Sequence, residues 1–212
     1  TYFVAGPENI LLNHLLNNES KEQALVRIVR ELAINGLNVF QLRAKNLDEN
    51  NIIALLKDIR SAIHNTNTKL CINDNVSIAS KVGNLIDILH LGQSDTHPDK
   101  ARRIIDSDIE IGLSITNENQ IDYIPDCVDY IGVGPIYKTN SKDDASEPLG
   151  ENGLKNIILK TNVPVVAIGG ISTTKVSKLF ELGVSGVAVI SNILNSENHL
   201  QNFISLKKQI YK

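Results

Sequence analysis

The sequence contains no methionine, only 4% aromatic residues and no excess of basic side chains, with a formal net charge of −3. A nucleic-acid-binding surface requires clustered basic residues and aromatic rings on which bases can stack. The composition therefore argues against a nucleic-acid partner. Because methionine is missing even at position 1, residue 1 need not be the first residue of the native chain.

Long apolar stretches and paired cysteines are also missing. No uncharged apolar run is long enough to cross a bilayer, and no basic segment followed by an apolar run opens the chain as a secretory leader would. The only cysteines, Cys71 and Cys127, form no CxxC pair and lie within apolar runs. Since disulfides are rare in the cytosol, we expect a cytoplasmic protein with two buried thiols and no membrane partner.

Short β-branched runs alternate along the chain with segments of helical periodicity. In the first such segment four apolar residues recur at helical spacing, and Gly36 follows as a stop signal. Strands that alternate with helices imply parallel pairing through crossovers. The runs with strand character are, in order, YFVA, NVFQLR, KLCIN, DILHL, EIGLSI, VDYIGV, PVVAIG and GVAVI.

Eight such strands predict an α/β fold, a closed (β/α)8 TIM barrel. No Pro- or Gly-rich linker divides the chain, so residues 1–212 are expected to form one barrel domain. The alternative is an open, doubly wound sheet, but no G-x-G-x-x-G follows the first strand. Residues 7–19 are polar and loosely patterned, and we expect a long first loop there.

Polar residues follow the predicted strands at the end where a parallel barrel gathers its functional groups. The second strand ends in QLRAK, and alternation places Gln41, Arg43 and Lys45 on one side if the strand continues through Lys45. Two cations and an amide at that end would form a clamp for a polyanion. The alternative is a strand end held by structural ion pairs.

The third and fourth strands bring acidic residues to the same end. The segment IND supplies Asn73 and Asp74, and HLGQSD supplies Gln93 and Asp95. Two carboxylates beside a basic clamp would suit Mg²⁺ that carries a pyrophosphate. The alternative makes Asp74 and Asp95 the N-caps of the helices that follow them.

The later strands end in hydroxyls and glycines that suit a second anion. Ser114 closes the fifth strand, the loop GVGPIYKTNSKDD carries Thr139, Ser141 and Lys142, and Gly170 follows the seventh strand. Loops after strands seven and eight of such barrels commonly bind phosphate through backbone N–H groups. For the loop after the sixth strand alone, a solvated turn is an equally good interpretation.

The histidines offer little general-base chemistry. His90 lies within a strand and is expected to be a core residue with satisfied hydrogen bonds. No His or Cys cluster predicts zinc, and no G-x-S-x-G elbow predicts acyl transfer. The remaining histidines are expected to be solvent-exposed on loops or helices: His14, His64, His97 and His199.

Seven motifs resemble, in order, those of the thiamine phosphate synthase family: QLRAK, IND, HLGQSD, IGLS, DYIGVGPIYKTNSK, PVVAIGGI and GVAVIS. The resemblance covers almost the whole chain, and seven motifs in the family's order make it specific. It implies a Mg²⁺-dependent transferase of thiamine biosynthesis with small-molecule substrates. This enzyme joins a pyrimidine methyl diphosphate, 4-amino-2-methyl-5-(diphosphooxymethyl)pyrimidine, to a thiazole phosphate, 4-methyl-5-(2-phosphoethyl)thiazole, and releases pyrophosphate. The oligomeric state stays open, a homo-oligomer included.

The resemblance also implies a role for each matching residue. Contacts with the pyrimidine substrate and its pyrophosphate would come from Gln41, Arg43, Lys45 and Asn73. Mg²⁺ would be held by Asp74 and Asp95, and pyrophosphate would also be bound by Ser114 and Lys142. The thiazole phosphate would be bound by Thr139, Ser141, Gly170, Ile190 and Ser191. The residues expected to act in catalysis are Arg43, Lys45, Ser114 and Lys142.

The implied mechanism needs no strong base. Pyrophosphate leaves first, the aminopyrimidine stabilises the resulting cation, and the thiazole nitrogen attacks with its own lone pair. These steps require charge neutralisation, positioning and exclusion of water. We expect the loop near residues 137–150 to close as a lid.

Three positions depart from the family pattern. Lys138 stands where Pro is common, Ser141 replaces a more usual Thr, and Thr116 stands where many relatives carry His. Because the related thiazole tautomerases rely on that His, its absence argues against a tautomerase. A phosphosugar isomerase would also require a base at the barrel mouth, and the sequence shows none there. A non-catalytic barrel that binds a phosphorylated ligand is the third alternative, and the retained Asp74 and Asp95 argue against it.

Overall fold

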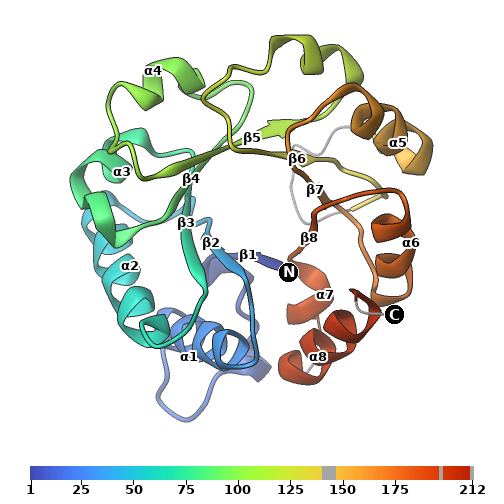
Figure 1. Ribbon diagram of the computed structural model, residues 1–212. Helices are drawn as coiled ribbons and strands as arrows, with labels where there is room; N and C mark the ends of the chain where they lie inside the picture. Colours follow the sequence, from blue (N-terminus) through green and yellow to red (C-terminus); the bar gives the residue numbers. More distant parts are fainter. Residues whose placement is uncertain (140–146, 196–197, 211–212) are drawn as a thin grey trace.

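Eight parallel strands form a closed barrel in this computed structural model, which describes residues 1–139, 147–195 and 198–210. Each strand pairs with its neighbours in sequence, and β8 closes the ring by pairing with β1 (Figure 1). The strands are β1 (Tyr2–Ala5), β2 (Val39–Leu42), β3 (Lys69–Asn73), β4 (Ile88–Leu91), β5 (Glu110–Ile115), β6 (Tyr130–Val133), β7 (Val165–Ile168) and β8 (Gly186–Val189). The predicted TIM barrel is confirmed.

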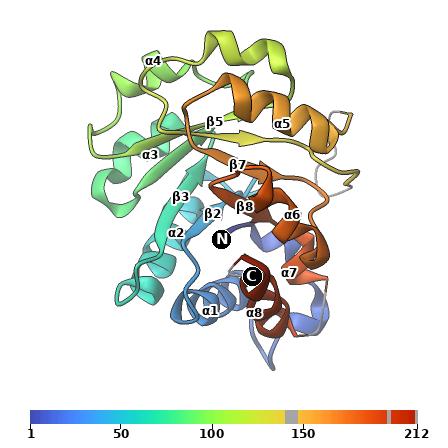
Figure 2. The same ribbon diagram turned by 45° about the vertical axis from the view of Figure 1, so that its right-hand side comes forward.

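Helices surround the barrel and cover its outer side, as both ribbon views show (Figures 1 and 2). The α-helices are α1 (Lys21–Ile34), α2 (Glu49–Ile63), α3 (Val76–Val82), α4 (Pro98–Arg102), α5 (Gly150–Lys160), α6 (Val176–Glu181), α7 (Ser191–Leu194) and α8 (His199–Ile210). The crossover from β5 to β6 instead contains a 3-10 helix, η4 (Glu118–Tyr123). Among the described residues, no helix is long and apolar enough to cross a membrane.

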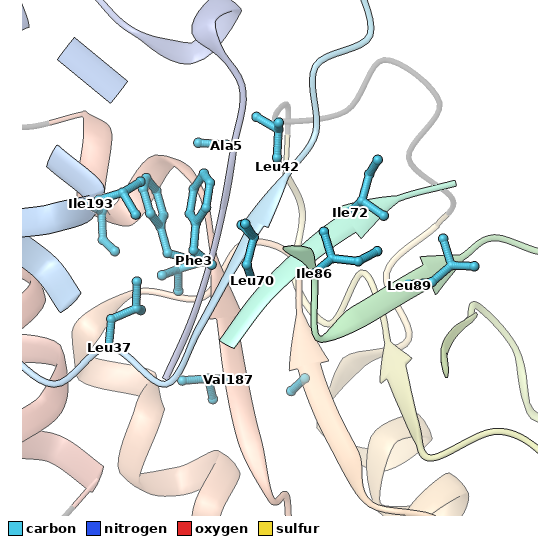
Figure 3. Packing of buried hydrophobic residues seen from close by; sticks show 14 of the residues in the cluster. Phe3, Ala5, Leu37, Leu42, Leu70, Ile72, Ile86, Leu89, Val187 and Ile193 are labelled. Carbon is cyan, nitrogen blue, oxygen red and sulfur yellow. The ribbon is translucent and has the colours of Figure 1, made fainter. Parts of the chain in front are cut away.

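Alternation along the strands sorts side chains between the helices and the barrel interior. On β1, Phe3 and Ala5 belong to the large core under the helices, where the Phe3 and Phe40 rings lie 5.5 Å apart. Figure 3 shows this packing, in which Phe3 of β1 and Ile193 of α7 belong to the same buried cluster. The intervening Tyr2 and Val4 face inward. This alternation explains why the strand runs read as continuously apolar, because both sides of the sheet are covered.

The barrel interior holds a second, smaller cluster of buried residues: Tyr2, Val4, Cys71, Ile88, Tyr130 and Ala188. Two glycines make room for the Tyr130 ring of this cluster and for the neighbouring ring of His90. A Cβ on Gly112 would lie 2.3 Å from the Tyr130 ring, and one on Gly132 would lie 3.0 Å from Cε1 of His90. The interior is therefore a packed floor beneath the barrel mouth.

The first loop is held to the barrel more firmly than its sequence suggests. It contains two 3-10 helices, η1 (Pro7–Asn9) and η2 (Leu12–His14), and Ile10 between them is buried in the core. His14 is buried and its ring meets that of His199 edge-on, 6.3 Å apart between centroids.

The expectation that His14 and His199 are solvent-exposed is therefore wrong. The cause is long-range packing: α8 returns against α1, where Nε2 of His199 lies 2.7 Å from a carboxylate oxygen of Glu31. His64 and His97 are exposed, as predicted.

Aspartates at the start of β4 and β6 tie neighbouring strands together at the N-terminal end of the barrel. The backbone N–H of Leu70 donates to Oδ2 of Asp87 over 2.7 Å, and the backbone N–H of Asp87 donates back to the Leu70 carbonyl. Arg60 donates to the same carboxylate oxygen. Asp129 repeats the arrangement with the N–H of Ile111. Because functional groups gather at the opposite end, these aspartates serve stability.

Replacing Asp87 by Ala should lower the free energy of unfolding by about 1–3 kcal/mol, because the buried N–H of Leu70 loses its side-chain acceptor. Urea denaturation measures this change. Asp58→Ala, on the exposed face of α2, is the matched control and should change stability by less than about 0.5 kcal/mol. Equal stability of the two variants would contradict the role given to Asp87.

Candidate active site

One cavity of about 440 Å³ lies at the C-terminal ends of the central strands. We call it the mouth cavity. Its lining includes seven of the residues singled out from the sequence: Arg43, Lys45, Asn73, Asp74, Asp95, Ser114 and Thr139. These side chains come from β2 to β6 and the loops that follow them, so barrel closure brings together groups that are far apart in the chain.

The two cations of the predicted clamp reach the same cavity, although the strand ends earlier than expected. β2 stops at Leu42, and Lys45 lies in a turn. The backbone N–H of Arg43 still donates to the carbonyl of Ala5 over 3.0 Å, which keeps Arg43 at the rim. Both cations line the mouth cavity even though the assumption of a strand through Lys45 is wrong. The first loop packs tightly against the backbone of Arg43, since a Cβ on Gly6 would lie 2.2 Å from the carbonyl oxygen of Arg43.

Neither acidic residue is a helix N-cap, so that alternative is wrong. Asn75 caps α3 by accepting from the N–H of Ile78, and Asp74 precedes it with a left-handed backbone, φ 63°. The Asn73 amide donates to Oδ2 of Asp74. Asp95 accepts the backbone N–H of Gly92 through Oδ2 over 2.7 Å, two residues before the cap position of α4.

The donor set of the mouth cavity fits Mg²⁺. Asp74 and Asp95 line the same space, and each carboxylate is oriented through one oxygen by a neighbouring N–H donor. Among the described residues, no group of three or more His, Cys, Asp or Glu side chains gathers into a metal cage. Two carboxylates without further protein ligands are typical of a magnesium site that is completed by waters and substrate phosphates.

A second cavity of about 690 Å³ lies beside the first, at the ends of β6, β7 and β8. We call it the outer cavity. The predicted residues that line it are Thr139, Gly170, Ile190 and Ser191. Thr139 lines both cavities, so the two predicted anion sites adjoin each other.

Glycine is required where the outer cavity meets the loop after β6. Gly170 has a left-handed backbone, φ 65°, and a Cβ there would lie 2.6 Å from the carbonyl oxygen of Lys138. The N–H groups of Ile136 and Tyr137 donate to the carbonyls of Ile168 and Gly169, which holds the two loops together. Gly170 and Ile171 of this turn line the outer cavity.

Tyr137 fixes the start of the loop that was expected to act as a lid. Its hydroxyl donates to Oε1 of Glu151 over 2.8 Å, and the ammonium of Lys175 lies 3.5 Å from its ring centroid. Burial, aided by the Glu151 carboxylate, raises the pKa of Tyr137 to about 12. The loop continues through Ser141 and Lys142, which lie outside the described residues, as does half of the expected lid.

Gln41 does not reach the mouth cavity. It is buried in the barrel interior, where its amide nitrogen donates to the hydroxyl of Tyr2 over 2.9 Å and to Sγ of Cys71 over 3.4 Å. Burial raises the pKa of Cys71 to about 12. Both cysteines of the described chain are free thiols, and Cys127 is only half-buried, unlike the prediction.

His90 is the residue that sequence reasoning undervalued. Both ring nitrogens have partners as expected of a core histidine: Nδ1 lies 2.9 Å from the hydroxyl of Tyr130 and Nε2 lies 2.9 Å from Oγ of Ser114. The expectation of a core histidine with satisfied hydrogen bonds is confirmed, and through Ser114, which lines the mouth cavity, His90 also contacts the edge of the barrel mouth. The two-residue alternation of β4, which turns Ile88 and His90 inward together, is the signal that predicts this placement.

Comparisons with known proteins agree with the motifs. A family model described as thiamine monophosphate synthase matches residues 12–193. A thiamine-phosphate synthase of Clostridium tetani is 39% identical over 84% of this chain and 84% of its own length. One from Lactococcus lactis is 30% identical over 99% of this chain and 95% of its own length.

A solved structure is similar over the whole barrel. Thiamine phosphate pyrophosphorylase from Pyrococcus furiosus superposes with a TM-score of 0.82 at 25% identity, covering 99% of this chain and 95% of that one. The residues that the family model matches, 12–193, contain every strand from β2 to β8 and the strand ends that line both cavities. The chain belongs to the thiamine monophosphate synthase family.

Proposed function

We propose that this chain is a thiamine-phosphate synthase that joins the pyrimidine methyl diphosphate to the thiazole phosphate and releases pyrophosphate. Family membership supports the reaction. The observation that carries the proposal is the lining of the mouth cavity, where Arg43, Lys45, Asp74, Asp95 and Ser114 share one space. Cations, carboxylates and a hydroxyl in one cavity are the groups that a departing diphosphate requires.

In this proposal the mouth cavity binds the diphosphate. Arg43 and Lys45 donate to its oxygens, and Asn73 and Ser114 add neutral donors beside them. Asp74 and Asp95 would hold Mg²⁺, which supplies Lewis-acid neutralisation of the charge on the leaving group. Ser141 and Lys142 keep their predicted roles, in thiazole phosphate and pyrophosphate binding respectively.

The outer cavity binds the phosphate of the thiazole. Its lining includes Thr139, Ser191 and Gly170, whose hydroxyls and backbone suit a phosphate without a metal. Because Thr139 lines both cavities, the two substrates lie next to each other when bound. The enzyme then contributes positioning, and the thiazole nitrogen supplies the electron pair for the new bond.

Water must be excluded from the cation that forms when pyrophosphate leaves. The rim of the cavities is closed on one side by the first loop, where Glu8 and Asn9 line the outer cavity. The loop after β6 is the candidate for the other side. A cytoplasmic location is part of the proposal and is supported by the two free thiols.

Turnover with both substrates, first with Mg²⁺ and then with excess EDTA, tests the function. We expect thiamine phosphate and pyrophosphate to form in a one-to-one ratio and formation to stop on chelation. Tight binding of either substrate without product would instead favour a non-catalytic phosphate-binding barrel. Isomerisation of a thiazole carboxylate phosphate without bond formation would favour the tautomerase.

Asp95→Asn should raise the Mg²⁺ concentration required for half-maximal rate and lower kcat by about a hundredfold, because the amide keeps the size but not the charge of the ligand. Steady-state kinetics over a Mg²⁺ series measures both. Asp58→Asn is the matched control and should match the unsubstituted protein. An unchanged Mg²⁺ dependence of Asp95→Asn would remove Asp95 from the metal site.

Gly170→Ala should raise the KM for the thiazole phosphate by about tenfold, because the added Cβ pushes the turn away from Lys138 and displaces its N–H groups. Gly183→Ala is the matched control, since Gly183 also has a left-handed backbone, φ 104°, but lies at the end of α6. Both variants should lose thermal stability. A KM that rises in both, or in neither, would contradict the placement of the phosphate.

A further inference from the structure

Five polar side chains form a continuous hydrogen-bonded chain across the barrel interior, which we call the interior chain. Its links are Gln41 to the Tyr2 hydroxyl (2.9 Å), Tyr2 to the Tyr130 hydroxyl (2.8 Å), Tyr130 to Nδ1 of His90 (2.9 Å) and Nε2 of His90 to Oγ of Ser114 (2.9 Å). It begins on β2, crosses β1, β6 and β4, and ends on β5 at the mouth cavity.

Cys71 fixes the direction in which Gln41 points. The Cys71 thiol lies 3.5 Å from the carbonyl oxygen of Ile72, and donation to this oxygen leaves the sulfur to accept from Gln41. The atom of Gln41 that faces both Cys71 and Tyr2 is therefore the amide nitrogen, which is a donor. Gln41 is buried, so this orientation has no competition from bulk water.

The orientation of Gln41 propagates to Ser114. When Tyr2 accepts from Gln41, the arrangement that satisfies every link has Tyr2 donate to Tyr130 and Tyr130 donate to Nδ1 of His90. A neutral imidazole that accepts at Nδ1 carries its proton on Nε2 and donates to Ser114. Burial raises the pKa of Tyr2 and of Tyr130, so both stay protonated donors. In that arrangement the Ser114 oxygen accepts from Nε2, and its hydroxyl hydrogen is available to a group in the mouth cavity.

We propose that His90 is a positioning residue whose Nε2–H, held in place by the interior chain, turns the Ser114 hydroxyl into a donor aimed at the departing diphosphate. The proposal rests on the proposed function. An anion that gains charge in the transition state needs a donor that is already oriented. A free serine hydroxyl rotates and would have to be ordered at that step.

The reverse direction of the same chain would give a different chemistry. If the Gln41 oxygen faced Tyr2, every hydrogen bond would invert, and Ser114 would donate to an unprotonated Nε2. Ser114 would then resemble a base-activated nucleophile rather than an anion donor. The two directions thus differ in one observable, the ring nitrogen of His90 that carries the proton.

The imidazole tautomer of His90 tests the direction without any substrate. Long-range ¹H–¹⁵N correlation spectra of histidine-labelled protein at pH 8 distinguish the two ring nitrogens, and a His90→Gln variant assigns the signal. We expect the neutral Nε2–H tautomer. An Nδ1–H tautomer, or a doubly protonated ring, would overturn the proposal. Because this readout does not depend on turnover, it stands even if the proposed reaction fails.

Kinetics then test the consequence for catalysis. Tyr130→Phe removes the donor to Nδ1, so it should lower kcat by about tenfold, the value of one oriented hydrogen bond, with less than a twofold change in KM for the pyrimidine diphosphate. Tyr123→Phe, whose side chain is 80% exposed, is the matched control and should leave both constants unchanged.

A double-mutant cycle separates positioning from a general structural effect. If the interior chain acts through Ser114, Tyr130→Phe should change kcat by less than twofold in a Ser114→Ala background. A full tenfold loss in that background would overturn the proposal. Absence of turnover in the unsubstituted protein would contradict the proposed function instead. If Tyr130→Phe does not fold, the His90 tautomer of the unsubstituted protein decides alone.

Discussion

Closure of the barrel by parallel pairing is the constraint on which the site depends. The last strand, β8, pairs with β1 through a short ladder in which Tyr2 lies opposite Ala188 and Phe3 opposite Val189. Because every pair is parallel, all strands present their C-terminal ends at one rim. Arg43 of the β2 end and Ser114 of β5 share a cavity for this reason alone. Without closure, the clamp and the carboxylates would lie along one edge of an open sheet rather than around one space.

The small radius of the barrel then decides what lies beneath the rim. Inward positions must fill a narrow floor, and Gly112 and Gly132 leave space for the rings of Tyr130 and His90. Polar atoms placed there must find partners, because an unpaired buried donor costs about 1–3 kcal/mol. The interior chain supplies these partners and ends at Ser114, whose hydroxyl lines the mouth cavity. The same residues therefore fill the barrel interior and contribute to the proposed site.

Sequence patterns predicted the parts of this protein that depend on periodicity. The apolar runs gave the strands, and polar residues at their ends gave most of the cavity lining. Local pattern could not predict contacts set by distant segments. The burial of His14 depends on α8 returning to α1, and the first loop passes close to the chain after β2, at Gly6 and Arg43. Gln41 was predicted to lie at the rim because alternation along a strand shows which side chains point into the barrel. It does not show how far below the rim a side chain lies.

Charge explains why the proposed site should need a metal in addition to its cations. Among the described residues that line the mouth cavity, the charged side chains are Arg43, Lys45, Asp74 and Asp95, whose formal charges cancel. The whole chain carries a net charge of −3, so the surrounding field adds no attraction for a polyanion. A diphosphate therefore gains little from this cavity through net charge alone. Binding of a divalent cation by the two carboxylates would leave Arg43 and Lys45 uncompensated, and the clamp suggested by QLRAK would become effective only then.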